Sequence, residues 1–424
     1  MAETIRQRGP ESRHAQPSDG GSAVGAMSEN GRPRESKLKR AAYALPLLGL
    51  GYAATRIMNV EPAVEWAKSL GQARGILELP SGSVRVLTSF YGLTGLDNFL
   101  TVANAFFLPS TYNADPTSRR QLTAFLTDGA VFLTIWIFES ARHATRWTPS
   151  RWPNIFITLG QALGIGPVSV LYCFTHYVAS PLDSTITPSK NTNTTPTPTN
   201  TPNQWNQKQN PKQKQKHRPN PAALPAVLLT YLLPFYLTLA WPDRPARQSL
   251  LYAWQLHPLW LSVGLRAGGR VVEDVRAKYG VESGKEEKVR EEEEEDRAVV
   301  RWSVGVAAAL GAGVWWWSLA QFGFGKVFVP AGLVLPSDGV RDLTGYTAEF
   351  LRWDQVFAAG SHLAWMAYLF WDLKAAGMLR EGWLKVVGLG LASVPLVGPG
   401  ATVGLGWLFR EHILATRTRK EAVN

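Results

Sequence analysis

The residues that could do chemistry in this chain are acids and polar side chains set inside long apolar segments. One group follows a 3-4-3 spacing, which places its members on a single face of a helix. These residues are Thr94, Asp97, Thr101 and Asn104. A carboxylic acid kept neutral by burial can donate a proton to a substrate. We therefore treat Asp97 as a candidate catalytic acid and its three neighbours as candidate pocket residues.

A second candidate acid, Asp128, shares an apolar segment with Trp136 and Glu139. Asp128 and Glu139 are eleven residues apart, which on a helix returns to nearly the same face but separates them by about 16 Å. They cannot act as a close carboxylate pair. Asp128 is thus an alternative proton donor, and Trp136 and Glu139 are candidate pocket residues. Glu139 is also near enough to Arg142 or His143 to pair with one of them instead.

A third group has acids at its ends and aromatic rings between them. Its members recur at helical intervals: Asp354, Ser361, Trp365, Tyr368 and Asp372. Asp372 is a candidate catalytic acid, and Trp365 and Tyr368 are candidate pocket residues, because aromatic faces stabilise cations and exclude water from them. Polar residues in membrane bundles also join helices by hydrogen bonds. That packing role stays open for all three groups.

Several kinds of chemistry have no signature in the sequence. We find no Gly-rich phosphate loop, HExxH motif, CxxC pair or nucleophile elbow, and the remaining His and Gln residues show no metal-ligand spacing. We therefore expect no metal and no cofactor. The net charge of +11 comes from Lys and Arg at the ends of apolar segments. That distribution favours the positive-inside rule over nucleic-acid binding.

The elements that must position these residues are apolar segments, most of which approach the roughly 20 residues that a bilayer core requires. They cover residues 41–59, 86–108, 121–140, 154–180, 222–241, 248–265, 299–322, 355–373 and 384–409. The pattern predicts an all-α protein, a polytopic transmembrane helical bundle with about eight or nine spans. Four basic residues after position 409 favour a cytosolic C-terminus and so shift the count towards eight. The endoplasmic reticulum is the default location.

Composition divides the chain into five parts. They are a disordered cytosolic tail (1–40), a first set of membrane helices (41–180), a low-complexity linker (181–221), a second set (222–415) with a charged loop at 266–298, and a C-terminal tail (416–424). The linker is rich in Thr, Pro, Asn and Gln and cannot form a core. We give it no functional weight.

Short strings in the apolar segments resemble a known family. They are Leu-Leu-Pro-Phe-Tyr at 232–236, Trp-Pro at 241–242, Trp-Gln-Leu at 254–256, Pro-Leu-Trp at 258–260, Trp-Asp-Leu-Lys at 371–374 and Val-Gly-Pro-Gly-Ala at 397–401, followed by Arg-Glu at 410–411. In these strings the chain resembles the fungal membrane-bound terpene cyclases typified by the ascofuranone-pathway cyclase, integral membrane proteins of secondary-metabolite pathways. The resemblance covers roughly residues 86–180 and 222–415 and supplies no catalytic residues.

The resemblance implies a metal-independent, proton-initiated cyclisation of a prenyl chain, often an epoxide, in meroterpenoid or terpenoid biosynthesis. The partners would be a lipophilic prenylated substrate and membrane lipid, and the sequence does not define an oligomeric state. Two other classes stay open. One is a non-catalytic membrane scaffold of a biosynthetic pathway. The other is a transporter of a small hydrophobic metabolite, although no related halves are evident.

Overall fold

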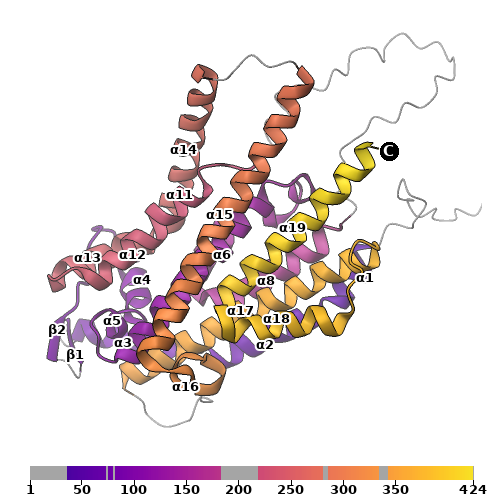
Figure 1. Cartoon of the computed structure of the whole chain (residues 1–424). Coiled ribbons are helices and arrows are strands. Elements are labelled where there is room, and N and C mark those ends of the chain that lie inside the picture. Colours follow the sequence, from indigo (N-terminus) through magenta and orange to yellow (C-terminus); the bar gives the residue numbers. More distant parts are fainter. Residues whose placement is uncertain are drawn as a thin grey trace, which may run out of the picture.

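The computed structural model describes residues 36–72, 75–79, 82–182, 218–279, 285–333 and 342–423. Nearly all regular structure in these ranges is helical, which confirms the predicted all-α class (Figure 1). Most of the predicted tail and linker, residues 1–35 and 183–217, lies outside the described residues.

The first elements of the chain are α1 (Lys37–Tyr43), α2 (Leu45–Ile57), α3 (Glu61–Gln72), β1 (Ile76–Leu79), β2 (Gly82–Arg85), α4 (Thr94–Ala105), α5 (Leu108–Thr111), α6 (Pro116–Ser140), η1 (His143–Thr145), η2 (Pro149–Arg151), α7 (Pro153–Leu163) and α8 (Ile165–Ala179). Those after residue 218 are α11 (Ala223–Val227), η3 (Leu228–Leu232), α12 (Leu233–Ala240), α13 (Arg244–Gln255), α14 (His257–Tyr279), α15 (Lys285–Phe322), α16 (Phe324–Val327), η4 (Val329–Gly332), α17 (Leu343–Ala375), α18 (Trp383–Val397) and α19 (Pro399–Val423). The strands β1 and β2 form an antiparallel hairpin in which Ile76 pairs with Arg85.

Helix α6 is the central helix of the bundle. It begins where the Asp115 carboxylate accepts the backbone N–H groups of Thr117 and Ser118, with Pro116 at its first position. In its most apolar 18-residue window, 94% of the residues are buried. It packs against α15 and α19, while α17 packs against α8, α19 and α2. Four of the largest fully buried side chains are the tryptophans at positions 136, 254, 365 and 407.

Three helices in the described part of the chain are long and apolar enough to cross a membrane: Pro116–Ser140, Ala223–Ala240 and Glu291–Phe322. The predicted eight or nine spans are therefore not confirmed. The predicted span 86–108 contains a non-helical approach and then only the 12 residues of α4. The predicted span 384–409 is divided at Gly398, whose φ of 85° ends α18 before α19 begins. Hydropathy measures composition alone. These two segments are apolar enough for a span, but neither forms one continuous helix.

The span Ala223–Ala240 contains one π-helical turn, η3, between α11 and α12. Pro234 stands in the first turn of α12 and has no N–H to donate to the preceding turn. A wider turn before a proline relieves the clash of its ring with the backbone. The Thr230 hydroxyl donates to the Ala226 carbonyl at 2.7 Å within the same stretch.

Helices α14 and α15 project together beyond the rest of the bundle (Figure 1). An ion pair joins them, with Arg276 Nη2 2.9 Å from Glu295 Oε2. Arg218 binds the same acidic stretch of α15 through Asp296 at 2.9 Å. Much of the segment expected to be a charged loop, 266–298, is thus helical on both sides of residues 280–284.

Candidate functional site

The candidate site is a small cavity in the bundle, lined mainly by residues from α6, α7 and α17, by the turn between α4 and α5, and by single residues of neighbouring elements. Its free volume is about 80 Å³. Its wall is rich in aromatic rings. The rings are those of Phe106, Phe107, Phe125, Phe132, Trp136, Tyr231, Trp254 and Phe350. Cavities with apolar walls and few polar groups are the usual small-molecule sites of proteins.

Asp354 supplies the carboxylate among the described residues that line this cavity, and its side chain is almost fully buried. Its Oδ1 accepts the N–H of Gly166 at 2.5 Å, and its Oδ2 accepts the N–H of Ile165 at 3.3 Å. These are the first N–H groups of α8, whose N-terminal dipole favours a negative charge. The carboxylate is therefore held in one orientation at the cavity wall.

Two glycines make this approach possible. A Cβ atom on Gly166 would lie 2.9 Å from both the side-chain and the backbone oxygen of Asp354. Gly164 has a φ of +85° and faces the same carboxylate, so it combines a left-handed backbone with a close contact. The local sequence around 164–166 is thus shaped to receive Asp354.

His257 and Gln161 add polar groups to the same wall. Nδ1 of His257 lies 3.2 Å from the carbonyl oxygen of Trp254. Because a carbonyl can only accept, Nδ1 carries the proton and Nε2 of the neutral ring is the acceptor. The cavity therefore offers one carboxylate, one imidazole and one amide among many aromatic rings.

A second layer fixes the aromatic wall from behind. The indole N–H of Trp136 donates to His362 Nε2 at 3.0 Å, and its ring stacks on Tyr172 with centroids 4.0 Å apart. Phe132 stacks on His362 at the same separation of 4.0 Å. The rings that face the cavity are therefore held by partners that do not face it.

Of the predicted pocket residues Trp136, Glu139 and Trp365, the last two contact His176. Trp365 donates its indole N–H to His176 Nδ1 at 3.2 Å, so Nε2 carries the proton and donates to Glu139 Oε2 at 3.1 Å. Glu139 also pairs with Arg142 at 2.7 Å and Arg410 at 3.0 Å. The ion pair with Arg142 expected from sequence is confirmed. Of these three pocket residues, Trp136 is the one that lines the cavity.

Asp128 lies on a different side of α6 from the cavity. Its carboxylate is packed against Gly400, at the start of α19, where an added Cβ would collide with it. Gly311 of α15 faces the same oxygen, and a Cβ there would be 3.4 Å away. The neighbouring Gly129 lines the cavity, but Asp128 faces the interface of α6 with α15 and α19.

Asp97 closes the turn that precedes α4. Its carboxylate accepts the N–H groups of Tyr91 and Gly92, each at 2.9 Å, and the hydroxyl of Ser89 at 3.1 Å. The hydrogen bond from the Tyr91 N–H is the main reason that the pKa of Asp97 lies below its ordinary value. The acid is thus held as an anion by its own loop.

The rest of the first predicted group joins α4 to α13. The hydroxyls of Thr101 and Tyr252 are 2.7 Å apart, and Gln255 donates to Asn104 Oδ1 at 3.0 Å. Thr94 is exposed at the start of α4. These hydrogen bonds join two helices, which is the packing role that the sequence left open.

Asp372 and Tyr368 attach α1 to α17. Arg40 donates to both oxygens of Asp372, and the Tyr368 hydroxyl donates to the Tyr43 carbonyl at 2.9 Å. The three predicted acids Asp97, Asp128 and Asp372 consequently occupy three separate environments. Asp354 was seen in the sequence as the end of a helical stripe, but nothing there indicated that α8 would begin opposite it.

The fold and the cavity define an all-α protein with apolar helices around a site rich in aromatic rings. Comparison with known families identifies the group within this class: the CtvD domain family matches residues 66–415. The chain therefore belongs to the CtvD domain family. No solved structure matches it.

Three fungal relatives are named FAD-dependent monooxygenases. The protein verC1 of Penicillium polonicum is 31% identical over 92% of this chain and 44% of its own length. The protein anuJ of Penicillium roqueforti is 28% identical over 92% of this chain and 43% of its own length. BOA8 of Botryotinia fuckeliana is 24% identical over 68% of this chain and 33% of its own length. The chain thus spans less than half the length of these relatives.

These names correct the expected reaction. A metal-independent terpene cyclase would be an isomerase or lyase, whereas a monooxygenase is an oxidising enzyme. The resemblance to the ascofuranone-pathway cyclases is not confirmed, and cyclisation as the function is wrong. The strings that suggested it are short and lie in or beside apolar segments, where similar composition recurs in unrelated membrane proteins.

The described residues do not fit an FAD site. Dinucleotides bind where a Gly-rich turn connects a strand of a parallel sheet to a helix. The pattern Gly-x-Gly-x-x-Ala at 49–54 lies inside α2, without a strand before it. The strands in the described ranges form a short antiparallel hairpin. We therefore assign no step of the reaction to a flavin held by these residues.

Proposed function

We propose that this chain is the membrane-embedded, substrate-holding part of an oxidising enzyme system of fungal secondary metabolism. In this proposal the aromatic cavity beside Asp354 binds the small molecule that is oxidised. The single observation that carries it is the cavity that combines aromatic rings with one oriented carboxylate. The names of the relatives support oxidation as the chemistry of the system.

The flavin belongs, in this proposal, to a region or partner other than the described fold. The relatives contain more than half of their length outside the match to this chain, which leaves room for such a region. The chain's own residues bind the substrate, exclude water from it and hold one end of it in place. Asp354 accepts a hydrogen bond from a hydroxyl or amine of the substrate, and His257 offers a second polar contact.

The substrate would be lipophilic, of which a prenylated molecule is one kind. Large apolar side chains cover the outside of α18, where Leu384 is 90% exposed and Leu391 65% exposed. Together with the three apolar helices, this surface supports a place in a membrane, for which we propose the endoplasmic reticulum. A lipophilic substrate would then reach the cavity from the bilayer.

The free volume of about 80 Å³ is smaller than the roughly 300 Å³ of a typical ligand pocket. Binding of a whole metabolite therefore requires the aromatic rings to move apart. A short end of a chain fits the existing space. We accordingly expect the substrate to insert one end beside Asp354 while the rest extends between helices.

Deletion of the coding gene in the producing organism tests this proposal. We expect one metabolite to disappear and a precursor with fewer oxygen atoms to accumulate, as measured by high-resolution mass spectrometry. Reintroduction of the unaltered gene should reverse both changes. An unchanged metabolite profile, or accumulation of a precursor with the same oxygen count, would contradict an oxidising role.

A further inference from the structure

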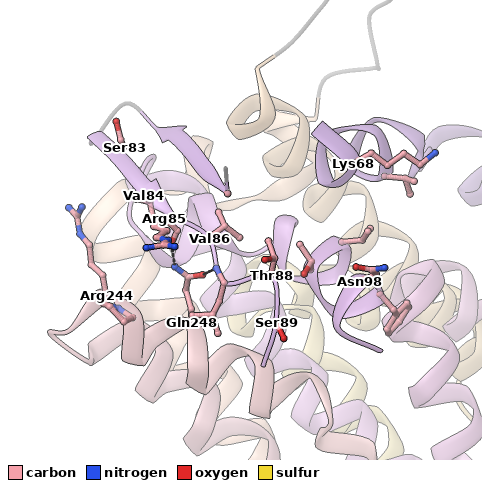
Figure 2. A pocket seen from close by; sticks show the side chains of 17 residues that line it. Lys68, Ser83, Val84, Arg85, Val86, Thr88, Ser89, Asn98, Arg244 and Gln248 are labelled. Carbon is pink, nitrogen blue, oxygen red and sulfur yellow. Dashed lines mark hydrogen bonds between the residues drawn. The ribbon is translucent and has the colours of Figure 1, made fainter. Parts of the chain in front are cut away.

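A second and larger hollow opens between the β1–β2 hairpin and helices α3, α4 and α13 (Figure 2). Its volume is about 1170 Å³. Arg85 and Arg244 lie on one side of it, Lys68 on α3 lies on the opposite side, and Thr88 and Ser89 lie between them (Figure 2). This hollow is separate from the aromatic cavity and shares no lining residue with it.

The charge on the lining of the hollow is positive. Its described lining contains three cations and no acid. Three acids lie next to lining residues without being part of the lining, and each accepts hydrogen bonds from neutral groups. Asp97 binds its own loop as described above, Glu78 accepts the Ser83 hydroxyl at 2.7 Å, and Asp243 accepts the Ala246 N–H at the start of α13.

The two arginines keep their charge available. Arg244 lies over the ring of Tyr112, 6.0 Å from its centroid, a contact that leaves a guanidinium charged and able to donate hydrogen bonds. Arg85 is exposed at the end of β2. Guanidinium groups bind phosphate oxygens well because their N–H groups form a planar fork.

The wall of the hollow is held in place before any ligand binds. Gln248, which is buried, donates to the Arg85 carbonyl at 2.7 Å and accepts the Leu87 N–H at 2.7 Å. The Tyr252 hydroxyl donates to the Leu87 carbonyl. The segment that carries Arg85, Thr88 and Ser89 is therefore tied to α13, which lowers the cost of ordering it on binding.

We propose that this hollow is a binding site for a phosphate ester, with its phosphate between Arg85 and Arg244 and the rest of the molecule extending past the hydroxyl of Thr88. The apolar side chains of Phe99 and Val102 on α4 contact the less polar part of the same molecule. A phospholipid headgroup and a soluble phosphate ester share this chemistry. The site goes beyond the proposed function and does not depend on it.

Binding measurements on the purified full-length chain in nanodiscs test the proposal. In one arm the nanodiscs contain phosphatidylcholine alone, and glycerol 3-phosphate and inorganic pyrophosphate are titrated by calorimetry. In the other arm, enrichment of phosphatidic acid around the protein is measured in nanodiscs that contain both lipids. Binding in the first arm identifies a soluble source, and enrichment in the second arm alone identifies a lipid source.

The variants Arg85→Gln and Arg244→Gln should each weaken binding about tenfold or more, since each loses charged hydrogen bonds. Thr88→Val should weaken it less. The control is Arg270→Gln on the exposed part of α14, which should leave binding unchanged. Circular dichroism and the thermal midpoint confirm that each variant folds. No binding in either arm, or an equal loss in the Arg270 control, would overturn the assignment.

Discussion

Arg40 and Asp372 are 332 positions apart in the chain and form a two-pronged ion pair inside the protein. Nη1 of Arg40 is 3.0 Å from Oδ1 of Asp372, and Nη2 is 2.7 Å from Oδ2. The same guanidinium donates to the Tyr177 carbonyl and lies over the Tyr177 ring at 4.0 Å. One side chain of α1 thus connects α8 and α17.

Replacement of Arg40 by Met should destabilise the protein because it leaves the Asp372 carboxylate buried without its partner. The expected cost is about 3–5 kcal/mol. Thermal unfolding followed by circular dichroism measures it. The double variant Arg40→Met with Asp372→Leu should recover much of the loss, since neither charge remains. The exposed Lys37→Ala is the matched control, and an equal effect of Lys37→Ala and Arg40→Met would contradict a role for the ion pair.

Replacement of Glu139 by Gln should destabilise the junction of α6 with α19. Glu139 is fully buried and faces Arg142, Arg410 and His176, so its loss leaves two arginines that the remaining acid, Glu411, does not balance alone. We expect a loss of roughly 3–5 kcal/mol and faster proteolysis after Arg410. Glu293→Gln, which breaks an exposed ion pair with Arg297, should cost less than about 1 kcal/mol. Similar unfolding of the two variants would show that the buried network adds no stability.

Asp97 should make stability depend on pH in the acid range. Its folded pKa lies below the ordinary value because backbone N–H groups bind the carboxylate. Its contribution is therefore complete above the unfolded pKa and is lost as the pH falls through the folded pKa. Thermal midpoints of the wild type and Asp97→Asn should differ at pH 7 and converge as the pH is lowered below about 4. A constant difference over this range would mean that ionisation of Asp97 does not stabilise the fold.

The class of the fold could be predicted from the sequence, but the site could not. Apolar segments and helix-capping residues such as Asp115 are local signals. They indicate helices from residues that are close together in the sequence. The cavity depends on residues such as Phe106, Trp136 and Asp354, which come from segments far apart in the chain. No spacing within one helix reveals that Asp354 meets the start of α8.

Helical periodicity misled the choice of acids for a related reason. Thr94, Asp97, Thr101 and Asn104 do share one helix, but the periodicity cannot say what faces them. Asp97 turned out to face its own loop, and Thr101 and Asn104 face α13. A polar stripe indicates only that its side chains have hydrogen-bond partners. A neighbouring helix can supply those partners as well as a substrate can.

Asp354→Asn should separate substrate binding from folding. The amide keeps the size of the side chain and one oxygen, so one of the N–H groups of Gly166 and Ile165 can stay paired. The other N–H then faces an NH₂ group, and we expect a stability loss of about 1–3 kcal/mol. In the gene-replacement strain, the oxidised metabolite should fall at least tenfold while the amount of protein in the membrane stays the same.

A second variant tests the cavity without altering its charge. Ala103→Leu places a larger side chain into the free space, at a packing cost of roughly 1–3 kcal/mol. It should lower the oxidised metabolite as Asp354→Asn does, because the substrate and the new side chain compete for the same volume. Ala267→Leu on the exposed part of α14 adds the same atoms outside the cavity and should have no effect. Normal metabolite levels in both Asp354→Asn and Ala103→Leu, with the protein folded, would place the substrate elsewhere in the chain.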